Sequence, residues 1–109
     1  SAVALLAQLE AGATTSVAIV EALRERAAAT EPRVNALSQP GWEEALRTAA
    51  ERDAERRRGM VRGLLHGLPF TVKDNIDAVG FETTVGLKEG GRRRPAADAI
   101  VVQLMREAG

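Results

Sequence analysis

The residue of this chain best suited to chemistry is Lys73, at the end of a predicted strand. Leu68, Phe70 and Val72 alternate with other residue types, which puts three large apolar groups on one face of a strand. Lys73 then points to the opposite face, and the Asp-Asn pair that follows it favours a turn. A lysine held in this way can act as a general base once its surroundings remove its proton.

The choice of basic residues sets Lys73 apart. Of the fifteen basic residues, only Lys73 and Lys88 are lysines, and the other thirteen are arginines. Arginine keeps its proton in proteins, whereas burial can turn a lysine into a working base. A sequence that uses arginine for positive charge therefore suggests a base at Lys73. The alternative is an ordinary strand-end lysine whose ammonium group reaches water, and composition alone leaves both interpretations open.

The residues around Lys73 form a long, ordered motif. Residues 63–77 read Gly-Leu-Leu-His-Gly-Leu-Pro-Phe-Thr-Val-Lys-Asp-Asn-Ile-Asp, residues 80–84 read Gly-Phe-Glu-Thr-Thr, and residues 95–99 read Pro-Ala-Ala-Asp-Ala. This order resembles the opening of the amidase signature family. Its members typically read G-x-L-x-G, a branched apolar residue and P-x-x-V-K-D-N, followed by a Thr-Thr pair and later by P-A-x-D-A. The resemblance covers most of this chain but only the first part of a family member.

The resemblance implies a hydrolase of carbon–nitrogen amide bonds. The family includes bacterial amidases, fatty acid amide hydrolases, allophanate hydrolases and the glutaminase subunit of tRNA-dependent amidotransferases. In these enzymes a serine nucleophile is activated through a second serine, held by a cis peptide bond, which a lysine deprotonates. Lys73 matches that lysine and is the single catalytic residue expected here. A small-molecule amide is the expected substrate, and no cofactor or metal is expected.

The two serines of this Ser-Ser-Lys triad lie well downstream in family members, in a loop rich in glycine and serine. This chain contains only Ser1, Ser16 and Ser38, none of them in such a loop. Amide hydrolysis needs a nucleophile and donors for the oxyanion as well as a base. We therefore expect no hydrolysis by the chain alone, and expect as its partner the remainder of the amidase domain or a complementary chain. Ser1 is expected to mark a truncated or processed terminus.

Three residues near Lys73 are expected to have roles other than direct catalysis. His66 is expected to be packed or to act as a cap at the strand entrance, with substrate contact as the alternative. Asp74 and Asn75 are expected to form a hydrogen-bonded turn that orients Lys73. In an assembled enzyme Lys73 should be enclosed, with Asp74 directed away from it. The structural alternative is a lysine that ties loops together through three hydrogen bonds.

The predicted fold class is α/β, with all 109 residues forming the N-terminal part of an amidase signature domain. The hydrophobic period changes from about 3.6 to about 2.0 near the lysine motif. Residues 1–60 are therefore predicted to be helical, and residues 61–109 to hold the lysine-motif strands and a helix. The two short strands of a mixed sheet are expected near residues 68–73 and 81–85.

Three helices are predicted before the lysine motif. Apolar periodicity and end signals place them at residues 2–11, 16–29 and 42–58. The second helix should begin weakly, because Ala18 stands where a capping box carries a glutamate. In the third helix, three oppositely charged pairs are four residues apart and can interact on its polar side: Glu43/Arg47, Arg47/Glu51 and Asp53/Arg57.

A last helix is predicted at residues 99–108, with Asp98 as its N-cap. Its larger apolar residues are expected to turn inward: Ile100, Val101, Leu104 and Met105. Leu87, in the loop before this helix, departs from the family, which often has a serine there. The shape of the pocket wall at this position is therefore left open.

Composition excludes several other classes of protein. The net charge is zero, so nothing favours nucleic acid or an anionic membrane as a partner. The absence of cysteine excludes disulfides and thiolate chemistry and is compatible with a cytoplasmic location. A single histidine, His66, argues against a histidine-based metal site. The first thirteen residues lack the basic start of a signal peptide, and the apolar runs are too short to span a bilayer.

Two other functions remain open at this point. The chain could be a non-catalytic interaction or scaffold fragment whose strand edges pair with a partner. It could also be a pseudo-amidase subunit that keeps the lysine motif without the serines. The observation that separates these alternatives is whether a second polypeptide, or a downstream reading frame after Gly109, supplies a strand and a Gly-Ser loop.

Overall fold

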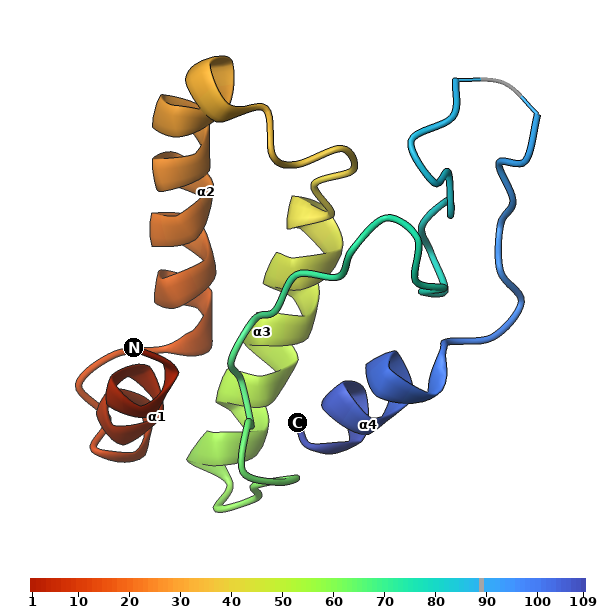
Figure 1. Cartoon of the computed structure of the whole chain (residues 1–109). Coiled ribbons are helices and arrows are strands. Elements are labelled where there is room, and N and C mark those ends of the chain that lie inside the picture. Colours follow the sequence, from red (N-terminus) through yellow and green to blue (C-terminus); the bar gives the residue numbers. More distant parts are fainter. Residues whose placement is uncertain (89) are drawn as a thin grey trace. The chain divides into compact units, whose positions relative to one another are not determined.

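The structure is a computed structural model that describes residues 1–88 and 90–109. Within those residues it contains four helices, shown in Figure 1: α1 (Ala2–Glu10), α2 (Ser16–Val34), α3 (Trp42–Arg57) and α4 (Ile100–Glu107). The chain divides into two compact units, one formed by Ser1–Pro69 with Ala108–Gly109 and the other by Phe70–Glu107. The four predicted helices are therefore present, three in the first unit and one in the second.

The predicted α/β fold class is wrong, because the described residues contain no strand or sheet. Their single strand-like pairing is an antiparallel bridge between Thr83 and Arg93. The strands predicted at residues 68–73 and 81–85 are both absent. A strand is stable when the N–H and C=O groups of a neighbouring strand pair with it. The alternating sequence indicates a half-buried face, but the described part of the chain offers no partner strand.

In the first unit, α2 and α3 lie side by side and run in opposite directions, as Figure 1 shows. The buried apolar side chains of this unit come from all three of its helices: Leu9 of α1, Ile19 and Val20 of α2, and Ala49 of α3. Removal of these groups from water favours the association of the helices. This core is small, and its buried apolar members are all aliphatic.

The start of α2 is capped twice, which corrects the prediction of a weak start. Thr15 is the N-cap, and its hydroxyl accepts a hydrogen bond from Ala18 N at 3.1 Å. The carboxylate of Asp53, from α3, accepts from Ser16 N at 2.7 Å and from Val17 N at 3.1 Å. Asp53 is only 8% exposed. Asp53 thus caps the first turn of α2 from another helix, through different N–H groups from the one that a capping-box glutamate binds. Its carboxylate is used there, and the pairing with Arg57 expected from its spacing is wrong.

The second helix is longer than predicted and continues past Pro32 to Val34. Asn35 ends it with a left-handed φ of 47°, and its N–H donates to Glu31 O at 2.9 Å. Pro32 lies in the last turn, where the loss of one backbone donor leaves the neighbouring hydrogen bonds in place. The helix therefore ends two residues after the proline, not at it.

The segment after α3 is joined to the last residues of the chain. Leu65 N donates to Ala108 O at 3.0 Å, and Gly67 N donates to Gly109 O at 2.9 Å. Gly67 has a φ of 82°, and a Cβ atom there would lie 2.1 Å from Ser16 Oγ. Both the backbone conformation and the close approach therefore require glycine at position 67.

The second unit has little core, and α4 is oriented differently from the prediction. Its buried apolar residues are Ala78 and Val102, which are 6% and 1% exposed. Ile100, Val101 and Leu104 are 77%, 53% and 59% exposed, so the prediction that they turn inward is wrong. The helix is apolar on both sides, and periodicity alone does not decide which side faces its own unit.

Asp98 does not have the capping role predicted for it. Its Oδ1 accepts from Val79 N at 2.7 Å, and its Oδ2 pairs with Arg106 Nε at 2.9 Å. It therefore joins the loop at Val79 to the last turn of α4. In the described part of the chain, no helix has the length and apolarity to cross a membrane.

Candidate active site

Lys73 begins a tight turn. Ile76 N donates to Lys73 O at 2.9 Å, which confirms the turn predicted at Asp74 and Asn75. The lysine side chain is exposed. The described residues therefore hold the backbone of Lys73 without enclosing its ammonium group, and its enclosure in an assembled enzyme stays a prediction.

Asp74 joins the lysine turn to residues 84–86. Its Oδ2 accepts hydrogen bonds from Thr84 Oγ1 at 2.6 Å and from Gly86 N at 3.0 Å. The bond from the Thr84 hydroxyl, followed by that from the Gly86 N–H, lowers the pKa of Asp74 below its ordinary value. The hydrogen bonding expected of Asp74 is thus present, with partners that the sequence alone did not single out.

Asp77, just after the same turn, contacts three other segments of the second unit. Its Oδ1 accepts from Thr83 Oγ1 at 2.6 Å, and its Oδ2 pairs with Arg93. Its carbonyl accepts from Ala99 N at 2.9 Å. The Thr83 hydroxyl, and then the Arg93 guanidinium, lower the pKa of Asp77. Each hydroxyl of the Thr-Thr pair therefore binds one carboxylate of the lysine turn.

The turn after the two threonines has an unusual backbone. Leu87 N donates to Thr84 O at 2.9 Å, and Val85 and Gly86 between them have φ values of 55° and 75°. A left-handed φ suits glycine but is strained for a β-branched residue such as valine. Sequence reasoning predicted a strand through Val85 and missed this turn, for which Gly86 was the available signal.

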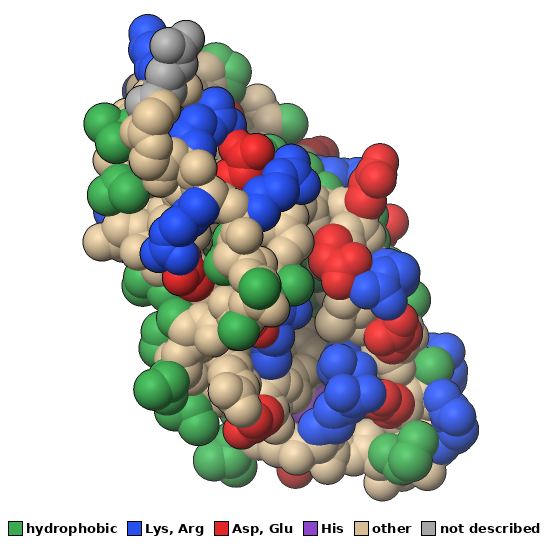
Figure 2. Space-filling model, turned by 90° about the vertical axis from the view of Figure 1, so that its right-hand side faces the viewer, with side chains coloured by type: hydrophobic (Ala, Val, Ile, Leu, Met, Phe, Trp, Pro, Cys, Tyr) green, Lys and Arg blue, Asp and Glu red, His purple; other side chains and the backbone are tan. Residues whose placement is uncertain are grey.

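Glu82 lies between two arginines of the run at positions 92–94. It forms ion pairs with Arg92 and Arg94, and the hydrogen bond from Arg92 is the main cause that lowers the pKa of Glu82. Figure 2 shows basic and acidic side chains next to one another over the face that it draws. Charges of both signs thus alternate there, in keeping with a net charge of zero.

His66 is buried in the first unit and is 1% exposed. Its Nδ1 accepts from Arg62 N at 3.2 Å, and its Nε2 lies 3.0 Å from Arg52 O. The tautomer that carries the proton on Nε2 satisfies both contacts. Both ring nitrogens are therefore used within the protein, which confirms the packed role over the substrate-facing alternative.

The three serines lie in different surroundings. Ser1 caps α1 by accepting a hydrogen bond from Ala4 N at 3.3 Å. Ser16 is 0% exposed at the start of α2, whereas Ser38 is exposed in the loop before α3. A substrate therefore cannot reach Ser16, and the hydroxyl of Ser1 is used as a helix cap.

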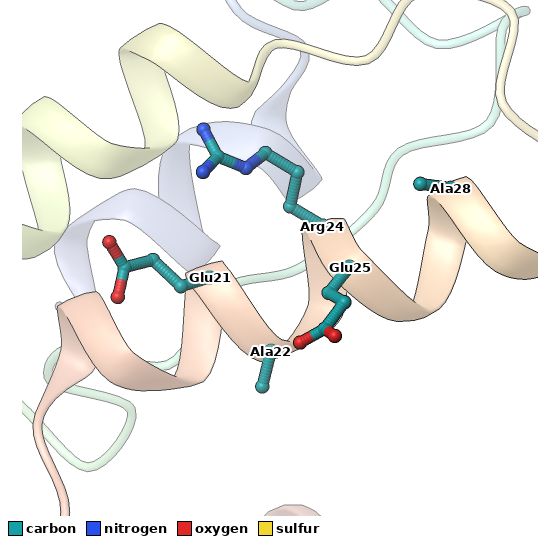
Figure 3. Close-up of a pocket in the computed structure, with 5 residues that line it drawn as sticks. All are labelled: Glu21, Ala22, Arg24, Glu25 and Ala28. Carbon is teal, nitrogen blue, oxygen red and sulfur yellow. The ribbon is translucent and has the colours of Figure 1, made fainter.

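Two surface hollows of the first unit lie along α2. One is lined by residues of α2 alone, and Figure 3 shows Arg24 and Ala22 pointing to opposite sides of that helix. The other includes Leu37 and Trp42. Neither hollow contains Lys73. Among the described residues, no three histidine or carboxylate side chains come together in a way that could hold a metal ion.

Comparison with known proteins places these features in a family. The family model described as Amidase matches residues 18–109. The chain is 38% identical over its full length to indoleacetamide hydrolase of Bradyrhizobium diazoefficiens, of which it covers 21%. It is also 38% identical, over 84% of its length, to an acylamidase of Rhodococcus erythropolis, of which it covers 19%. The chain thus spans about a fifth of the length of these curated relatives.

Solved structures show the same relationship. The chain is similar to the peptide amidase of Stenotrophomonas maltophilia, with a TM-score of 0.86 and 42% identity over 96% of this chain and 22% of that one. A second crystal structure, of an amidase, gives a TM-score of 0.89 and 42% identity over 98% of this chain and 24% of that one. From its sequence and from its backbone, the chain therefore belongs to the amidase signature family.

Proposed function

We propose that this chain supplies the general base, Lys73, of an enzyme that hydrolyses carbon–nitrogen amide bonds. The observation that carries the proposal is the position of Lys73 within the matched region, at the head of a turn whose two aspartates are held by neighbouring threonines. The relatives include an indoleacetamide hydrolase and a peptide amidase. A small-molecule amide is accordingly the proposed substrate.

In the proposed reaction, neutral Lys73 accepts a proton from a serine hydroxyl, and that serine activates the nucleophilic serine. The nucleophile attacks the amide carbonyl, and the C–N bond breaks as the amine leaves with a proton from the same relay, which leaves an acyl ester on the serine. Water, deprotonated by the same relay, then attacks this ester, which releases the carboxylic acid and returns the proton to the serine. A lysine in water is almost wholly protonated at neutral pH, so the base must be enclosed before it can act. Lys73 is exposed in this chain, and the remainder of an amidase domain is proposed to enclose it.

The remainder of the domain is also proposed to supply both serines. The chain covers about a fifth of the length of its relatives. Of its own serines, Ser1 caps α1 and Ser16 is buried. The apolar side chains exposed on α4 give such a remainder a surface to cover: Ile100, Val101 and Leu104. The remainder could follow in the same chain or come from a complementary one.

The test is a chimera in which this chain replaces the segment it matches in the Stenotrophomonas maltophilia peptide amidase. The chimera is expected to hydrolyse the parent's amide substrate, whereas the isolated chain should not. Lys73→Ala and Lys73→Arg should each lower kcat by roughly 10²–10⁴-fold, because arginine keeps the charge without the basicity. Lys88→Arg is the matched control, since Lys88 is the other lysine and is exposed.

Two results would contradict the proposal. A folded chimera without activity would favour the non-catalytic or pseudo-amidase alternative. A Lys73→Arg chimera that keeps most of its kcat would mean that Lys73 acts only as a fixed charge.

A further inference from the structure

We propose that Asp74 is the residue that positions the lysine turn, by locking it to the strained turn at residues 84–87. Its functional meaning rests on the proposed role of Lys73 as the base. The structural claim itself is independent of activity, because it concerns only how two turns of the second unit are coupled.

The coupling includes two hydrogen bonds to one carboxylate oxygen of Asp74. Asp74 follows Lys73 directly, so one peptide bond joins the backbones of the two residues. Its Oδ2 receives both Thr84 Oγ1 and Gly86 N, at 2.6 and 3.0 Å. Gly86 N also lies 3.2 Å from Thr84 Oγ1, so the three groups close a small triangle. A displacement of either turn would therefore break contacts in the other.

The hydrogen bonds of this triangle flank Val85, whose backbone conformation is strained. Val85 has a φ of 55° and is 61% exposed, so side-chain burial is not what keeps it in the left-handed region. The residues on both sides of it, Thr84 and Gly86, each donate a hydrogen bond to Asp74. The same contacts thus hold a strained valine on one side and the backbone of Lys73 on the other.

The test uses NMR spectroscopy of the full chain. Asp74→Ala is expected to raise the amide exchange rate of Gly86 about tenfold or more, because a charge-assisted bond is lost. It should also raise the exchange rate of Ile76, whose N–H closes the lysine turn. Asp74→Asn keeps an oxygen acceptor, so it should raise the exchange rates of Gly86 and Ile76 less than Asp74→Ala does.

Two further variants separate positioning from general destabilisation. Asp98→Ala is the matched control, because Asp98 also accepts one backbone N–H and pairs with one side chain in the same unit. It should leave Gly86 and Ile76 unchanged. Val85→Gly removes the strain, so in that background Asp74→Ala should have a smaller effect on Ile76.

The chimera adds a functional measurement. Asp74→Ala should lower kcat about 10–100-fold with KM within about twofold, because a base displaced by an ångström loses alignment. Asp98→Ala should keep kcat. The proposal is overturned when Asp74→Ala leaves Ile76 unchanged, or when Asp98→Ala changes it equally. An inactive chimera built with the unmutated chain would contradict the function of Lys73, while the exchange rates would still decide the role of Asp74.

Discussion

Among single residues, Glu55 of α3 illustrates how the fold alters the ionisation of a side chain. Its carboxylate pairs with Arg62 and, at 3.2 Å, with Arg52. The pKa of Glu55 is lowered from 4.5 to about 2, with the hydrogen bond from Arg62 as the largest cause and the charge of Arg52 as a smaller one. The folded state therefore binds a proton at Glu55 less readily than the unfolded chain does.

The consequence is a defined pH dependence of stability. A lowered carboxyl pKa adds stability that is fully present above about pH 4.5 and is lost as the pH falls through about 2. Glu55→Gln should remove this contribution, so its free energy of unfolding should fall less steeply than that of the unmutated chain between pH 4.5 and 2. Urea unfolding at several pH values measures both slopes.

The control is Glu10→Gln, which changes an exposed glutamate of α1. It should keep the slope of the unmutated chain. Equal slopes for Glu55→Gln and the unmutated chain would show that the ion pairs of Glu55 do not couple protonation to folding.

Among the helices, α3 supplies hydrogen-bond acceptors for the first turn of α2. The first turn of α2 has backbone N–H groups without partners inside the helix, as every helix does. Asp53 of α3 binds two of them, and Thr15 binds a third. The negative charge of Asp53 also lies at the positive end of the dipole of α2. The contact thus orients the two helices as well as capping one.

Removal of this contact should destabilise the first unit. Asp53→Ala leaves two N–H groups of α2 without acceptors, one of them on the fully buried Ser16, and should cost about 2 kcal/mol. Thr15→Ala should cost about 1 kcal/mol. Chemical denaturation followed by circular dichroism gives both values.

Glu51→Ala is the matched control for Asp53, because it removes a carboxylate from α3 that pairs with Arg47 at the surface. Its cost should stay within about 0.5 kcal/mol. An Asp53→Ala variant as stable as this control would mean that water replaces the carboxylate at the start of α2.

For the whole molecule, the outward face of α4 is the main unexplained apolar surface of the second unit. Leu104 is 59% exposed on a helix that buries Val102, so apolar residues occupy two sides of α4. Exposed apolar patches of this kind commonly mark an interface. Since the chain covers 22% of the peptide amidase that it matches, the remaining part of that fold is the proposed occupant.

This assignment predicts the behaviour of a split enzyme. When this chain is produced together with the unmatched part of the peptide amidase as two polypeptides, Leu104→Arg should weaken their association at least tenfold. The reason is that a buried leucine contributes about 1.5–3 kcal/mol. Gln103→Arg, on the same helix, is the control and should bind nearly as the unmutated chain does. Equal affinities, or self-association of the chain through α4, would contradict the assignment.

The sequence by itself determined the helices, the turn after Lys73 and the family. Helix positions follow from periodicity and from caps such as Thr15, which are signals contained within a few neighbouring residues. The turn at Asp74 and Asn75 is equally local. Such features need no knowledge of what lies elsewhere in the chain.

Only the tertiary structure decided which partners the residues have. The strand expected at residues 68–73 is absent because a strand depends on a neighbour that no local pattern specifies. Asp53 reaches a helix that begins 37 residues earlier, and Asp74 reaches Gly86, 12 residues later. Helical spacing likewise left open which side of α4 faces its own unit. These outcomes are set by contacts between segments distant in sequence, where burial and hydrogen bonding outweigh local preference.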